Sequence, residues 1–208
     1  MKDKPIDESR RQFFRRAASK TSEAVVKKID DKVNAKAANY IRPPYALSEV
    51  DFLLTCTRCN ACVEACEPNC LFPLSSNLGM DVAATPAMDL VNRSCLLCDG
   101  FPCVSACEPK ALRINISESN DDSNDEIKSE QRPLKIANVF ILPSECLPFQ
   151  GPECGVCVDL CPIDQALSLE DNKPVINQNL CVGCAQCRSI CIVDPKAITL
   201  KSIYNAPT

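Results

Sequence analysis

The sequence predicts an α+β fold with two tandem cysteine-rich domains, each built from short helices and two-stranded sheets. Sixteen of the 17 cysteines in this 208-residue chain fall into four similar runs. A polar and acidic stretch over residues 117–132 separates the first two runs from the last two. The segment before the first run has apolar residues at helical spacing, which predicts a preceding amphipathic helix.

The fourth run shows the cysteine pattern most plainly, because it reads CxxCxxCxxxC without interruption. This is the spacing of the cysteine ligands of a [4Fe-4S] cluster in bacterial ferredoxins. The first run is equally regular, the second is stretched by two residues, and the third has a long first gap. The four runs are Cys56, Cys59, Cys62 and Cys66; Cys95, Cys98, Cys103 and Cys107; Cys146, Cys154, Cys157 and Cys161; and Cys181, Cys184, Cys187 and Cys191.

The fourth cysteine of each run lies about one helical turn beyond the third, so it points toward a neighbouring cluster. The runs therefore work in pairs, and their separations pair the first with the second and the third with the fourth. We predict four [4Fe-4S] clusters with these ligand sets: set 1, Cys56, Cys59, Cys62 and Cys107; set 2, Cys95, Cys98, Cys103 and Cys66; set 3, Cys146, Cys154, Cys157 and Cys191; set 4, Cys181, Cys184, Cys187 and Cys161. Cys70 is left over, either as a structural thiol or as a substitute ligand for Cys66.

Two other uses of cysteine fit the pattern less well. A disulfide scaffold is disfavoured because the number of cysteines is odd and they recur every third residue. Structural zinc usually takes two separated pairs of Cys or His ligands, whereas each run supplies three closely spaced thiols and a fourth, and the chain has no histidine. Iron-sulfur binding is therefore favoured.

The composition also narrows the function. Without histidine, the chain lacks the usual general base near neutral pH and the usual haem ligand. Its five glycines form no phosphate-binding or dinucleotide-binding loop. We expect an electron-transfer protein with no catalytic residues, no small-molecule substrate and no nucleic-acid partner.

Charge is divided unevenly along the chain. Residues 1–42 hold twelve Lys and Arg against six Asp and Glu, and the remainder holds eleven against twenty-one. Each oxidised cluster with its four thiolates adds a net charge of about −2. The acidic body favours a basic face on a redox partner, although the basic N-terminal segment could instead lie on this body.

The N-terminal segment, residues 1–44, contains the sequence SRRQFFR from Ser9 to Arg15, which resembles a twin-arginine export motif. An export signal needs an apolar core directly afterwards, and charges from Lys20 to Lys32 interrupt that position. We therefore expect a cytoplasmic protein, or a periplasmic one if the motif is read by an export system.

Apolar residues from Phe14 to Ala37 recur at intervals of three, four and seven residues. This spacing predicts an amphipathic helix that ends before Arg42, Pro43 and Pro44. Such a stripe packs on its own domain or a partner more often than on lipid, although contact with a membrane surface is open. No stretch approaches the length of a transmembrane helix.

The expected boundaries are a first cluster domain over residues 45–116, an acidic linker over 117–134 and a second cluster domain over 135–208. One helical turn should span the third to the fourth cysteine of each run, with prolines ending those turns. Short strands are expected in pairs. The candidates are residues 112–116, 139–142, 166–169, 174–176 and 197–203.

From Ile41 to Ile203 the sequence resembles the ferredoxin-type MauM/NapG family and its relative NapF. The resemblance depends on the stretched second run with Pro102 before Cys103, and on the CxxFQGxxC lead-in of the third run, which begins at Cys146. It implies a protein with four [4Fe-4S] clusters in two bacterial-type dicluster ferredoxin domains, associated with periplasmic nitrate reductase-type systems. Its N-terminus, with SRR followed by IRPP, is NapF-like.

Three roles are compatible with this resemblance. The first is electron relay to or from a redox enzyme, with a reductase catalytic subunit or a quinol dehydrogenase as the partner. The second is a cytoplasmic maturation or assembly factor that binds an immature molybdenum or iron-sulfur enzyme. The third is the iron-sulfur subunit of a larger oxidoreductase.

Overall fold

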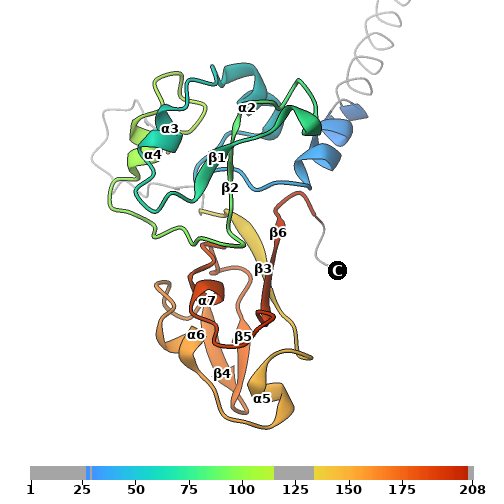
Figure 1. The fold of residues 1–208 in the computed structure, drawn as a ribbon, viewed down its shortest axis with the longest axis vertical. Coiled ribbons are helices and arrows are strands. Elements are labelled where there is room, and N and C mark those ends of the chain that lie inside the picture. Colours follow the sequence, from blue (N-terminus) through green and yellow to red (C-terminus); the bar gives the residue numbers. More distant parts are fainter. Residues whose placement is uncertain (1–26, 29, 115–133, 206–208) are drawn as a thin grey trace, which may run out of the picture.

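The computed structural model describes residues 27, 28, 30–114 and 134–205. They form two lobes (Figure 1): a first lobe, residues 30–114, and a second lobe, residues 134–205. The twin-arginine-like motif and all but the last residue of the expected linker 117–134 lie outside the described residues. Among the helices described, none is long and apolar enough to cross a membrane.

The first lobe begins with a helical segment that ends at Ala37. Most of the apolar stripe predicted for the N-terminal helix, from Phe14 to Val26, lies outside the described residues, so that helix stays a prediction. The other helices of the lobe are short, and two of them are single turns that contain the third cysteine of a run. They are α2 Glu49–Thr55, α3 Ala61–Glu64, the 3₁₀ turn η1 Ser76–Leu78 and α4 Pro102–Ser105. Ser48 caps α2 by accepting a hydrogen bond from the amide of Asp51. Strands β1 Leu71–Pro73 and β2 Pro86–Met88 pair antiparallel, with Leu71 opposite Met88.

The second lobe has two small antiparallel sheets with helical turns beside them. Its elements are β3 Ala137–Ile141, α5 Leu147–Gln150, α6 Val156–Asp159, β4 Leu167–Glu170, β5 Lys173–Ile176, α7 Gln186–Ser189 and β6 Ile198–Ser202. Strand β3 pairs with β6, so the first and last strands of the lobe lie together. Strands β4 and β5 form a hairpin whose turn residues, Asp171 and Asn172, both have positive φ.

The structure has a helical turn in each of the four places where one was predicted, but each turn begins and ends earlier than the predicted span from the third to the fourth cysteine. Helices α3, α4, α6 and α7 each begin one residue before the third cysteine of a run and end two residues before the fourth. Four of the five expected strands correspond to β3, β4, β5 and β6. The strand expected over residues 112–116 is wrong within the described residues, because Leu112 makes only an isolated bridge with Ala46. Strands β1 and β2, which contain Pro73 and Pro86, were not predicted.

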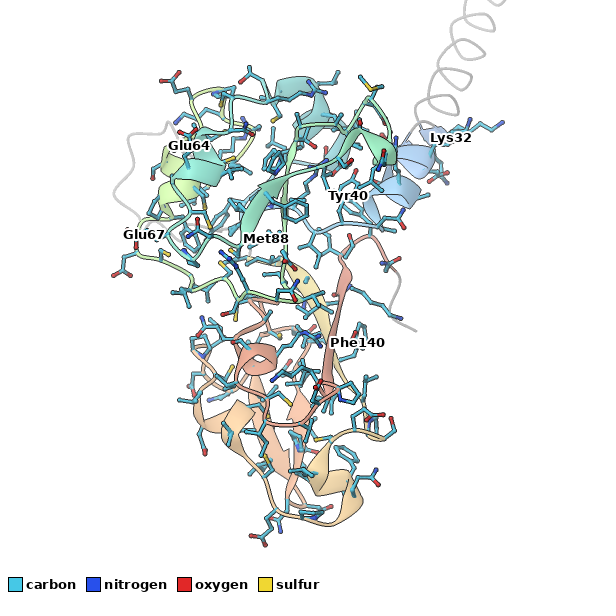
Figure 2. All side chains as sticks on the ribbon, in the orientation of Figure 1. Lys32, Tyr40, Glu64, Glu67, Met88 and Phe140 are labelled. Atoms are coloured by element: carbon cyan, nitrogen blue, oxygen red, sulfur yellow. The ribbon has the colours of Figure 1, made fainter. Side chains whose placement is uncertain are left out.

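One apolar core continues from the first lobe into the second. Phe52, Met88 and Leu112 of the first lobe belong to the same cluster of buried residues as Ile136 and Ala137 of the second. Figure 2 shows Met88 within the first lobe and Phe140 on the β3–β6 sheet of the second. The lobes are therefore joined by packing as well as by the chain.

Candidate metal centres

The loops between the cysteines curl through left-handed backbone positions. The residue two places before the third cysteine has positive φ in three runs: Asn60, Phe101 and Ala185. The residue two places after the first cysteine does so at Arg58, Leu97 and Gly183. This second position turns a backbone N–H toward the preceding sulfur, and those N–H groups lower the pKa of the thiols against the larger effect of burial at Cys56 and Cys181.

The cysteines of set 1 lie around one cavity. Cys56, Cys59 and Cys62 come from the loop before α3 and its first turn, and Cys107 comes from the end of the α4 turn. Phe52, Pro86, Pro109, Ala111 and Leu112 complete much of the apolar wall. The amide of Leu112 also donates a hydrogen bond to the sulfur of Cys107, at 3.4 Å. The structure therefore brings together the four residues of the set, and their role as ligands stays a prediction.

Set 2 surrounds a second cavity, which includes one further thiol. Cys66, Cys95, Cys98 and Cys103 line it, and so does Cys70. The sulfurs of Cys66 and Cys70 lie 3.5 Å apart, and Cys70 is buried. A hydrogen bond with Cys95 raises the pKa of Cys70, and the same bond lowers the pKa of Cys95 to about 7. The sequence contained no signal for this position beyond the spare cysteine itself.

The second lobe repeats the arrangement. Cys146, Cys154, Cys157 and Cys191 of set 3 line a cavity whose apolar wall includes Ile141, Pro174 and Ile198. In set 4, burial raises the pKa of Cys187 to about 12, and the neighbouring charges of Cys184, Cys181, Cys157 and Cys161 act in the same direction. Cys187 therefore lies near the other members of set 4 and also near Cys157 of set 3.

Apart from Cys70 and Cys95, burial is the largest effect on the thiols whose pKa is shifted. It raises the pKa of Cys62 to about 11 and that of Cys103 to about 12, because the thiolate form is poorly solvated there. These free thiols stand in for thiolates bound to iron. Binding a metal would release their protons and neutralise part of the buried charge.

The donor sets of the three cavities fit [4Fe-4S] clusters, because at least four soft thiols converge on each of these mainly apolar cavities. Among the described residues, no three His, Cys, Asp or Glu side chains approach closely enough to hold a single metal ion. A cubane uses a wider ring of thiolates than one ion does, because each thiolate binds a different iron corner.

The small sheets, the helical turns and the converging thiols define the class: an iron-sulfur electron-transfer protein of ferredoxin type. Comparisons with known proteins agree. The chain is 31% identical over 207 residues to the methylamine utilization ferredoxin-type protein MauM of Methylophilus methylotrophus, covering 92% of this chain and 85% of the relative. It is 32% identical over 170 residues to the ferredoxin-type protein NapG of Escherichia coli, covering 76% and 68%.

The ferredoxin-type protein NapF of Escherichia coli is 29% identical over 174 residues, which cover 81% of this chain and 89% of that protein. No family model matches the chain. No solved structure matches it either. The identities to MauM and NapG over most of their length show that the chain belongs to the ferredoxin-type MauM/NapG family. Membership implies a redox partner and a role in electron transfer rather than catalysis.

Proposed function

We propose that the chain binds four [4Fe-4S] clusters through sets 1 to 4, in two dicluster domains, and relays single electrons between redox proteins. The observation that carries the proposal is the exchange of cysteines between paired runs. Cys107 of the second run completes the cavity of the first, and Cys191 of the fourth completes that of the third. This is the crossed arrangement of two-cluster ferredoxins.

A bound [4Fe-4S] cluster supplies a one-electron redox couple. The chain's own residues would set its properties. Buried side chains such as Phe52 and Leu112 shield part of set 1 from water, and the Leu112 amide would donate a hydrogen bond to a ligand sulfur of that set. Hydrogen bonds to sulfur and solvent exposure are among the main factors that set the reduction potential. Exposed Cys59 marks the most accessible ligand of set 1.

We propose a cytoplasmic location and a partner in a nitrate reductase-type system, either a reductase catalytic subunit or a quinol dehydrogenase. The similarity to NapG and NapF supports this choice of system. The similarity to a methylamine utilization protein gives a second candidate system, in which the partner would belong to amine oxidation. In both cases the acidic body favours a basic docking face.

Iron analysis tests the proposal first. Anaerobically reconstituted protein should contain about sixteen irons per chain, from four cubanes. Stoichiometric zinc in place of iron would contradict it.

Kinetics with a candidate partner then separate relay from assembly. A relay protein, once reduced, should be reoxidised by the partner reductase at catalytic rates. Stable binding to the immature enzyme without turnover would favour the assembly factor.

A further inference from the structure

The two lobes meet at two ligand-bearing loops. The amide of Cys95, in set 2, donates a hydrogen bond to the carbonyl oxygen of Cys184, in set 4, at 2.9 Å. The side-chain amide of Gln186 returns one to the carbonyl oxygen of Cys95, at 3.0 Å. A direct backbone hydrogen bond thus joins a cysteine of set 2, in the first lobe, to a cysteine of set 4, in the second lobe.

This junction is buried and held at several points. Cys95 and Cys184 are each 7% exposed, and Ala185 between Cys184 and Gln186 is 1% exposed. All three belong to the apolar core that both lobes share. Arg188 adds a hydrogen bond across the junction, from Nε to the carbonyl oxygen of Val91, at 3.1 Å. Such a contact excludes water and fixes the two loops relative to each other.

The other sets lie away from the junction. Within each lobe the paired helical turns pack together, α3 on α4 and α6 on α7, so set 1 adjoins set 2 and set 3 adjoins set 4. Helix α2, which leads into Cys56 of set 1, lies at the far side of the first lobe (Figure 1). Helix α5, which follows Cys146 of set 3, lies at the opposite tip of the molecule.

We propose that the four sets form a single line in the order 1, 2, 4, 3, and that the Cys95–Cys184 contact is the electron crossing between the lobes. This inference rests on the proposed function. The order differs from the order of the runs in the sequence. Because electron tunnelling falls steeply with distance, sets 1 and 3 are then the two ends at which partner proteins exchange electrons.

Two variants of the full chain test the order by electron paramagnetic resonance. The first keeps sets 2 and 4 and carries Cys56→Ser, Cys59→Ser, Cys154→Ser and Cys157→Ser. The second keeps sets 1 and 3 and carries Cys98→Ser, Cys103→Ser, Cys181→Ser and Cys187→Ser. Each should retain about eight irons. After reduction, the first should show signals broadened or split by spin coupling, and the second two independent narrow signals. Equal coupling in both, or coupling only in the second, would overturn the order.

Amide hydrogen exchange in the unmodified, cluster-loaded protein keeps the inference testable if these variants fail to fold. The Cys95 amide should exchange at least about 100-fold more slowly than those of the exposed loop at Gly100. Fast exchange of the Cys95 amide would show that its hydrogen bond to Cys184 does not form in solution, and would contradict the proposed crossing. Iron content separates failure of this inference from failure of the proposed function. A protein with about sixteen irons but a fast-exchanging Cys95 amide would contradict only the proposed order of the sets, whereas a protein that binds no iron would contradict the proposed function itself.

Discussion

Arg42 and Glu49 form a buried, two-point ion pair in the first lobe. The distance from Nη2 of Arg42 to Oε1 of Glu49 is 2.6 Å, and that from Nε to Oε2 is 2.9 Å. The guanidinium also lies over the rings of Tyr40 and Phe52, at 4.4 and 4.5 Å from their centroids. It joins the segment before α2, the helix itself and, through Thr85 and Pro86, the β2 strand.

Replacing Glu49 with Gln should destabilise the protein by about 3–5 kcal/mol, because it leaves the Arg42 charge buried without its counter-charge. The measurement is anaerobic denaturant unfolding of the cluster-loaded protein. Asp81→Asn is the matched control, since its ion pair with Lys36 is much more exposed, and it should change stability by less than about 1 kcal/mol. Equal unfolding midpoints for the two variants would show that the buried pair has no special weight.

The sequence allowed the repeating parts of this structure to be predicted. The helical turns before the fourth cysteines follow from the spacing of the runs, and the strands of two of the three small sheets, β3–β6 and β4–β5, were among the candidates, whereas those of the β1–β2 sheet were not. The Arg42–Glu49 pair could not be predicted, because nothing local marks a charged residue that will be buried by contacts 43 and 44 residues away in the chain. The left-handed conformations at Arg58 and Leu97 were equally hidden, since neither is glycine.

The candidate site likewise has a part that the sequence predicts and a part that it does not. The crossed grouping of Cys107 with set 1 and Cys191 with set 3 follows from helical geometry, and the structure places these residues together. The position of Cys70 beside Cys66 and the contact between Cys95 and Cys184 depend on how whole loops and lobes pack. Tertiary packing of this kind has no local signature in one sequence.

Cys66→Ala and Cys70→Ala should separate a ligand from a neighbouring thiol. Cys66→Ala should lose up to about four irons per chain, whereas Cys70→Ala should keep about sixteen. Both residues are buried and their sulfurs are 3.5 Å apart, so each substitution makes a similar small cavity. Iron analysis and the resonance spectrum of the reduced protein are the measurements. Loss of iron from Cys70→Ala would instead make Cys70 a substitute ligand.

Removing the metal should unfold much of the chain. Six of the sixteen buried residues of the shared core are cysteines, and five of those six are assigned as ligands: Cys62, Cys66, Cys95, Cys107 and Cys184. Apolar burial alone gives marginal stability to units of this size. An iron chelator used under anaerobic conditions should therefore abolish the protection of backbone amides against hydrogen exchange, and iron with sulfide should restore it. A metal-free chain that keeps its protection would contradict this.

Gly183, between Cys181 and Cys184, should tolerate no side chain. Its φ is +81°, and an added Cβ would lie 2.2 Å from the carbonyl oxygen and 2.5 Å from the nitrogen of Ala137 on β3. These are backbone atoms, which cannot rotate away as a side chain can. The neighbouring amide of Ile136 also donates a hydrogen bond to the carbonyl oxygen of Val182, at 2.7 Å. Gly183→Ala should therefore push the set 4 loop off the strand and lower the iron content by up to about four per chain.

Gly100→Ala provides the matched control for this last prediction. Gly100 also has positive φ, at +68°, but an added Cβ would meet nothing within 4 Å. Its substitution should cost only the left-handed backbone strain, about 1–2 kcal/mol, and leave the full iron content. Iron analysis and unfolding of both variants compare close contact with strain alone. If Gly100→Ala lost as much iron as Gly183→Ala, backbone conformation rather than the contact with β3 would control the binding loop.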